Sequence, residues 1–148
     1  MRTIKFKGKS VDSSEWIEGY YYKECDNTYI IKDRQKDSML NRNEAVLVAP
    51  DTVCQFTGLT DKNGKEIYEG DILRVGSYPC LVVWSDSGCF FLWHDPIHFS
   101  LKEEEEKEEL SKIDSIKTLG YLLRTYACTV DGSIHDPELR KKLGIQED

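Results

Sequence analysis

The sequence predicts a mainly β protein, with a small barrel-like or two-sheet architecture and a short C-terminal helix. Short runs of β-branched and aromatic residues recur at close spacing, and Gly, Asn and Asp separate them. Helix signals come late in the chain. The 148 residues, 39% hydrophobic and 32% charged, suit a globular protein. We expect one domain over residues 1–148, built either as one unit or as two β subdomains, about 1–50 and 51–148.

The first expected strand, residues 3–7, alternates in polarity. Ile4 and Phe6 fall on one face, and Thr3, Lys5 and Lys7 fall on the other. Period two is typical of a half-buried strand. We therefore expect the two apolar residues to face the core and the lysines to face solvent, where their charge discourages edge-to-edge pairing.

The second expected strand, residues 16–23, is rich in aromatic residues, which suit a pleated surface. Its alternation places Trp16, Tyr20 and Tyr22 on the same face as Glu18. Gly19 interrupts the run, which indicates a bulge or a close approach of another backbone.

Further strands are expected between turn residues along the chain. Their ranges are 29–32, 45–49, 53–57, 66–68, 72–75, 81–84 and 89–93. Residues 33–44 are mostly polar and form a long connection. The Asn63-Gly64 pair readily takes positive φ, so we expect a tight reversal there. Residues 85–88 are expected to turn between the last two strands.

Two segments carry helix signals. Residues 100–112 begin with a capping-box pattern but contain few apolar residues, so helix and disordered loop both remain open. Residues 136–144 are the stronger case. Asp136 can cap the N-terminus, Pro137 suits the first helical position, Leu139 and Leu143 stack four residues apart, and Gly144 can end the helix.

Composition limits where the protein acts. No apolar run approaches the roughly 20 residues of a membrane helix, and the first ten residues lack the apolar core of a secretory signal. We expect a protein of the bacterial cytoplasm with no membrane partner.

The five cysteines, Cys25, Cys54, Cys80, Cys89 and Cys128, form no CxxC pair. We expect them to be reduced, small apolar residues of the core.

No pattern for metal binding or catalysis stands out. Cys89, His94 and His98 lie close in sequence, but Pro96 disfavours a helix, and a strand would hold the two histidines about 13 Å apart. The sequence has no GxSxG elbow, no phosphate loop and no singled-out carboxylate pair. We expect no enzyme, no catalytic residue, no metal and no cofactor.

Nucleic-acid binding is an alternative function. The net charge is −7, but the first nine residues hold Arg2, Lys5, Lys7 and Lys9 and no acid. These residues could line one strand face, with Trp16 or Tyr20–Tyr22 nearby for stacking, as in small barrels that bind single strands. Because the whole chain is acidic, a solvated edge strand beside an aromatic core is favoured over this hypothesis.

Residues 52–73 resemble the hallmark block of the YopX family, small proteins encoded by phages and prophages. The likeness runs through the central segment QFTGLTDKNGKEIYEGDI, although Cys54 stands where the family usually has Gly. Residues 2–6 and 16–20 resemble the start of the family. Residues 130–139 resemble its closing block, from which Asp131 and Ser133 depart.

The resemblance implies a β-rich fold and no established activity, so it carries over no catalytic residue. The residues of the block are read first as a folding signature: Phe56, Thr57, Gly58, Leu59, Asp61, Asn63, Gly64, Ile67, Tyr68, Glu69, Gly70 and Asp71. The favoured hypothesis is a non-enzymatic phage or prophage accessory protein that acts by protein contact. Its expected partners are a second copy of itself or an unknown phage or host protein.

Overall fold

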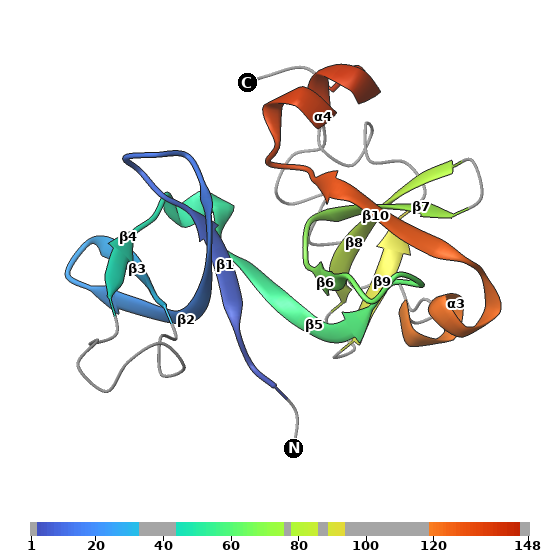
Figure 1. Cartoon of the computed structure of the whole chain (residues 1–148), viewed down its shortest axis with the longest axis horizontal. Coiled ribbons are helices and arrows are strands. Elements are labelled where there is room, and N and C mark those ends of the chain that lie inside the picture. Colours follow the sequence, from blue (N-terminus) through green and yellow to red (C-terminus); the bar gives the residue numbers. More distant parts are fainter. Residues whose placement is uncertain (1–2, 33–43, 76–77, 86–88, 94–118, 146–148) are drawn as a thin grey trace. The chain divides into compact units, whose positions relative to one another are not determined.

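Two antiparallel sheets make up most of the described chain (Figure 1). The computed structural model describes residues 3–32, 44–75, 78–85, 89–93 and 119–145. The larger sheet has the order β4-β3-β2-β1-β5-β6, and the smaller one has the order β10-β7-β8-β9. The strands are β1 (Phe6–Lys9), β2 (Trp16–Glu24), β3 (Asn27–Ile31), β4 (Ala45–Leu47), β5 (Cys54–Thr60), β6 (Glu66–Tyr68), β7 (Asp71–Val75), β8 (Tyr78–Ser85), β9 (Cys89–Trp93) and β10 (Cys128–Ser133).

The mainly β, two-sheet architecture with a short C-terminal helix is therefore confirmed. The strands that the structure describes form no closed barrel. The chain divides into two compact units, Met1–Gly58 and Leu59–Asp148, and β5 runs through the boundary between them.

The N-terminal unit is a strongly curled sheet with a small apolar core. Ile17, Ile30 and Val48 are buried at its centre. The curl brings the segment after β4 beside the end of β1, where Ser10 and Val48 form an isolated bridge. A short 3-10 helix, Pro50–Thr52, then leads into β5. Lys9 donates its backbone N–H to the Thr52 hydroxyl at 2.9 Å, which ties this helix to β1.

Gly19 marks a close backbone approach, one of the two alternatives that the sequence leaves open. A Cβ at this position would lie 2.0 Å from the carbonyl oxygen of Ile31. Its φ of +157° is rarely adopted by residues with side chains. Only glycine therefore lets β3 approach β2 this closely.

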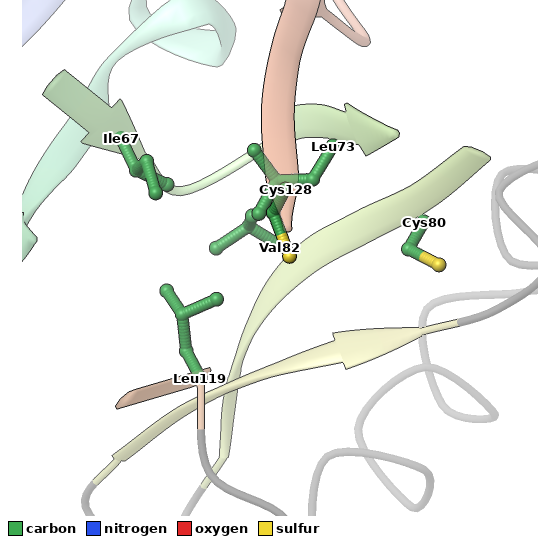
Figure 2. Close-up of a cluster of buried hydrophobic side chains, with 6 residues drawn as sticks. All are labelled: Ile67, Leu73, Cys80, Val82, Leu119 and Cys128. Atoms are coloured by element: carbon green, nitrogen blue, oxygen red, sulfur yellow. The ribbon is translucent and has the colours of Figure 1, made fainter. Parts of the chain in front are cut away.

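The smaller sheet in the C-terminal unit is buried on both faces. One face carries a cluster of six buried residues, Ile67, Leu73, Cys80, Val82, Leu119 and Cys128 (Figure 2). Ile72, Leu81 and Val83 point to the opposite face, where Leu139 and Leu143 pack against them. Burial on both faces explains the apolar run of residues 80–83, since neither face of this part of β8 is left for solvent, whereas Trp84 beyond it is 39% exposed.

Two short helices cover this sheet. Helix α3 (Leu119–Thr125) contributes Leu119, and helix α4 (Pro137–Leu143) contributes the two predicted leucines. Pro137 at the start of α4 and Gly144 in the left-handed conformation after it are confirmed. Asp136 occupies the N-cap position as predicted, but its side chain does not cap the helix. Its Oδ2 accepts the N–H of Ser133 at 2.8 Å and makes no side-chain cap bond to the helix.

No helix among the described residues has the length and apolar character that crossing a membrane would require.

Several expectations about single elements need correction. The first strand begins at Phe6, and Ile4 lies before it with 56% of its surface exposed, so it does not join the core. Cys25 is not a core residue: it is exposed in the β2–β3 turn, with φ of 55°. Strand β10 and helix α3 were not among the predicted elements.

Some predictions lie outside the described residues. They concern the connection over residues 33–43, the candidate helix within 100–112, and the side chains of Arg2, His94 and His98.

Candidate functional site

Two rows of uncharged side chains lie on the outer face of β2, β3 and β4. Strand pairing places Tyr22 opposite Tyr29, and Tyr29 opposite Leu47. The adjacent row has Tyr20 opposite Ile31, and Ile31 opposite Ala45. Because alternate residues of a strand share a face, these six residues form one surface, which we call the tyrosine face: Tyr20, Tyr22, Tyr29, Ile31, Ala45 and Leu47.

The tyrosine face is open to solvent. Tyr20 is 49% exposed, Tyr22 39% and Leu47 37%. The rings of Tyr22 and Tyr29 lie 5.8 Å apart between centroids, tilted by 33°. A hydrogen bond to Glu24 raises the pKa of the Tyr22 hydroxyl. The bond links Tyr22 to the acid that closes this face at the turn end of β2.

The opposite side of the same hairpin also leaves an aromatic residue accessible. Tyr21 is 45% exposed, although its ring contacts Phe6 at a centroid distance of 5.5 Å. The last five residues of β2 are all exposed. Exposed aromatic residues this close together exceed the scattered apolar side chains that are ordinary on a protein surface.

A row of three lysines, two on β1 and one just before it, continues the outer face. Lys7 and Lys9 place their Nζ atoms 4.5 Å and 5.3 Å from the centroid of the Trp16 ring. Lys5 lies over the ring of Phe56 at 5.0 Å. The predicted juxtaposition of these lysines with Trp16 is thus present in the fold. We call Lys5, Lys7 and Lys9 the lysine row.

The lysine row is only partly available to an anion. Strand pairing sets Lys7 opposite Glu18, so a carboxylate shares the surface with the ammonium groups. The ammonium groups already lie over the aromatic rings, where cation–π attraction holds them. A base that stacked on the same face of Trp16 would compete with Lys7 and Lys9 for the ring.

The family block contains a buried carboxylate that organises backbone. Asp61 Oδ1 accepts the N–H groups of Asn63 at 2.8 Å and Lys65 at 2.9 Å. Its Oδ2 accepts the N–H of Val130 at 3.0 Å. Burial alone would raise the pKa of Asp61, but these three backbone bonds and the charge of Lys65 lower it on balance. The carboxylate therefore has a structural task that fully explains its burial.

The turn between β6 and β7 uses a second carboxylate in the same way. Asp71, 1% exposed, accepts the N–H of Tyr68 at 2.8 Å. Gly70 has φ of 83° and donates its N–H to the carbonyl of Val82 at 2.9 Å. Glu69 follows Tyr68 in the same turn, and burial raises the pKa of its carboxyl group. Asp61 and Asp71 thus serve two different turns.

The other residues of the block form strand and core. Ile67 and Tyr68 are buried, Leu59 packs against the cluster of Figure 2, and Phe56 is 9% exposed. Gly58 and Gly64 have φ values of 85° and 80°. Asn63 does not share the positive φ expected for it, because the reversal is a turn from Asp61 to Gly64, closed by the bond from Gly64 N–H to Asp61 O at 3.0 Å.

Cysteine chemistry offers no site in the described core. Burial raises the pKa of the Cys80 thiol to about 11, and neighbouring Cys128 adds to this shift. Burial also raises the pKa of Cys128. Both thiols therefore stay protonated and unreactive at neutral pH. Within the part of the chain that the structure describes, no three His, Cys, Asp or Glu side chains group as a metal site would require.

Sequence reasoning found part of the tyrosine face. It placed Tyr20 and Tyr22 on one face of β2, but it did not include the four residues of the neighbouring strands, Tyr29, Ile31, Ala45 and Leu47. The period-two pattern of residues 29–31 and 45–47 contains these residues. The register that joins the three strands is a property of the folded sheet, which that pattern alone does not fix.

Comparison with known proteins identifies the family. The sequence model described as YopX protein matches residues 2–123, which include the central block, while residues 130–139 lie beyond the match. The crystal structure of protein EF1440 from Enterococcus faecalis has a similar fold, with a TM-score of 0.52 and 22% sequence identity over 94% of this chain and 99% of that chain. Among curated proteins, none matches. The chain belongs to the YopX protein family.

Proposed function

We propose that this protein is a non-enzymatic, phage- or prophage-encoded accessory protein that binds protein through the tyrosine face, with a second copy of itself as the occupant. The observation that carries the proposal is the pair of uncharged rows on β2, β3 and β4. Tyrosine is enriched at protein interfaces because its ring is apolar and its hydroxyl is polar. Asp61 and Asp71 accept backbone N–H groups, which supports structural roles for them rather than acid–base roles.

The charges around the tyrosine face favour a second copy as partner. Glu24 lies at the turn end of the face, and Lys7 and Lys9 lie at its other end beside Glu18. Two copies packed in opposite directions would bring the acidic end of each to the basic end of the other. Such an isologous contact is the usual form of a dimer with two-fold symmetry. The face itself is uncharged, so it avoids the repulsion that a chain of net charge −7 would otherwise meet.

The exposed area of the tyrosine face sets the expected affinity of the dimer. A tyrosine buries on the order of 200 Å², so the exposed parts of Tyr20 and Tyr22 amount to roughly 350 Å² over two copies. This area is well below the roughly 1,200 Å² at which specific, stable interfaces begin. The dimer should therefore be weak, which requires measurement over a range of concentrations.

Size-exclusion chromatography with light scattering tests this proposal. The wild-type mass should rise with concentration, and the double variant Tyr20→Ser/Tyr22→Ser should remain monomeric. Tyr126→Ser is the matched control, because Tyr126 is 48% exposed but lies outside the tyrosine face. A wild-type chain that stays monomeric at all concentrations, or equal behaviour of the two variants, would contradict the proposal.

Nucleic-acid binding is the second candidate, and the lysine row beside Trp16 favours it. Fluorescence anisotropy with single- and double-stranded DNA at low salt tests it. Binding should be lost in the triple variant Lys5→Glu/Lys7→Glu/Lys9→Glu. The control is Lys141→Glu/Lys142→Glu, which reverses two exposed charges on α4. No binding, or equal losses in both variants, would remove this candidate.

A further inference from the structure

The β5–β6 turn holds the sequence pair most prone to spontaneous deamidation. Asn63 is the only one of the four asparagines in the sequence that a glycine follows. Glycine has no side chain to hinder its own backbone nitrogen, so this nitrogen can reach the side-chain amide before it. Asn63 and Gly64 are both exposed, so solvent has access to both groups.

The reaction balances without any group beyond water. The backbone nitrogen of Gly64 gives its proton to solvent and attacks Cγ of Asn63. A bond forms between this nitrogen and Cγ, the bond from Cγ to the amide nitrogen breaks, and ammonia leaves with a proton taken from water. Water then opens the five-membered succinimide at either carbonyl, which yields aspartate or isoaspartate.

The fold restrains the nitrogen that must attack. Three successive N–H groups, those of Asn63, Gly64 and Lys65, all donate to oxygen atoms of Asp61, at 2.8, 3.0 and 2.9 Å. Asp61 in turn donates its own N–H to the carbonyl of Lys65 at 2.8 Å. Both the proton of the Gly64 nitrogen and the rotation of the peptide that carries it are therefore fixed.

We propose that Asn63 is a latent self-modification site, which Asp61 keeps unreactive in the folded chain and which reacts when the turn opens. Opening requires the bonds to Asp61 to break together, as in a local unfolding event. The reaction has a lasting consequence. Isoaspartate inserts one extra carbon into the backbone between residues 63 and 64, so the turn could no longer present all three N–H groups to Asp61.

Peptide mapping by mass spectrometry of the full chain tests the proposal at mildly alkaline pH. We expect deamidation of Asn63 to be at least tenfold slower in native buffer than in urea, which corresponds to about 1.4 kcal/mol of opening free energy. Asn27, which precedes Thr28, is the internal reference for an asparagine without a following glycine. Equal deamidation rates at Asn63 in native buffer and in urea would show that the fold gives no protection. No deamidation of Asn63 in urea would show that this residue is not a modification site.

Two variants separate opening of the turn from global unfolding. Asp61→Asn should deamidate at Asn63 faster than the wild type in native buffer, because its amide nitrogen would face the Val130 N–H. Ile72→Val weakens the core of the same C-terminal unit, so it should leave the rate at Asn63 unchanged if the turn opens locally. Acceleration by Ile72→Val alone would overturn the role of Asp61. If Asp61→Asn does not fold, the comparison of native and urea-unfolded wild type still decides.

Discussion

Asp61 accepts the backbone N–H of Val130 at 3.0 Å across 69 residues of sequence. The same carboxylate closes the β5–β6 turn, so it joins the family block to β10 in the C-terminal unit. The neighbouring bond from Lys62 N–H to the carbonyl of Cys128, 3.2 Å long, reinforces this link. One buried side chain thus connects a local turn to a non-local strand.

Replacement of Asp61 should be costly to stability. We expect Asp61→Asn to lower the free energy of unfolding by about 2–4 kcal/mol, because it weakens two bonds and leaves the Val130 N–H facing another donor. Asp131→Asn should cost no more than about 1 kcal/mol, since the pair with Arg74 is partly exposed. Urea unfolding followed by circular dichroism measures both. Equal losses in the two variants would contradict the role given to Asp61.

The stabilising effect of Asp61 should depend on pH. Its pKa is lower in the folded chain than the unfolded value of about 3.9. The contribution is therefore fully present above this value and is lost as pH falls through the lower folded pKa. The difference in urea midpoint between wild type and Asp61→Asn should be constant from about pH 7 to 5 and shrink below about pH 4. A difference that persists unchanged at pH 3 would refute this.

The contribution of Glu69 to stability should have the opposite dependence on pH. Burial raises its pKa above the unfolded value, so the folded state prefers the protonated acid. Its contribution is present below the unfolded pKa and is lost as pH rises through the folded pKa. Glu69→Gln should therefore stabilise the chain at pH 7 but have little effect at pH 4, as judged from thermal melting at the two pH values. A destabilised Glu69→Gln at pH 7 would show that the carboxylate has a favourable partner.

Glycine replacements separate steric conflict from conformational freedom. Gly19→Ala should cost about 3 kcal/mol or more, because its Cβ would overlap the carbonyl oxygen of Ile31. Gly120→Ala lies within α3 and meets no atom within 4 Å, so it should stabilise by up to about 1 kcal/mol. Chemical denaturation of the two variants tests the pair. A tolerated Gly19→Ala would mean that β2 and β3 can separate at low cost.

Patterns formed by residues close together in the sequence predicted several elements correctly. Strand β6 and strand β9 have the predicted bounds, and α4 lies where Pro137 and Gly144 place it. The register of β2 keeps Trp16, Tyr20 and Tyr22 on one face, as the alternation requires. Each of these features depends on residues close together along the chain.

The missed elements depend on distant partners. Strand β10 contains Asp131 and Gly132, which disfavour a strand, and its pairing with β7 shifts between Val130 and Gly132. Pairing with β7 and the bond to Asp61 hold it in place. Ile4 and Cys25 were misjudged for a related reason. Alternation and residue type indicate which side chains share a face, but the packing of other strands decides which face is buried.

Concentration-dependent hydrogen exchange tests the tyrosine face most directly. The account predicts that raising the concentration of the full chain slows exchange in peptides covering residues 16–31 and 44–49, and that Tyr20→Ser/Tyr22→Ser abolishes this effect. Peptides of the C-terminal unit should exchange equally at both concentrations. Protection confined to the C-terminal unit, or none at any concentration, would contradict the assignment of this face as the binding surface.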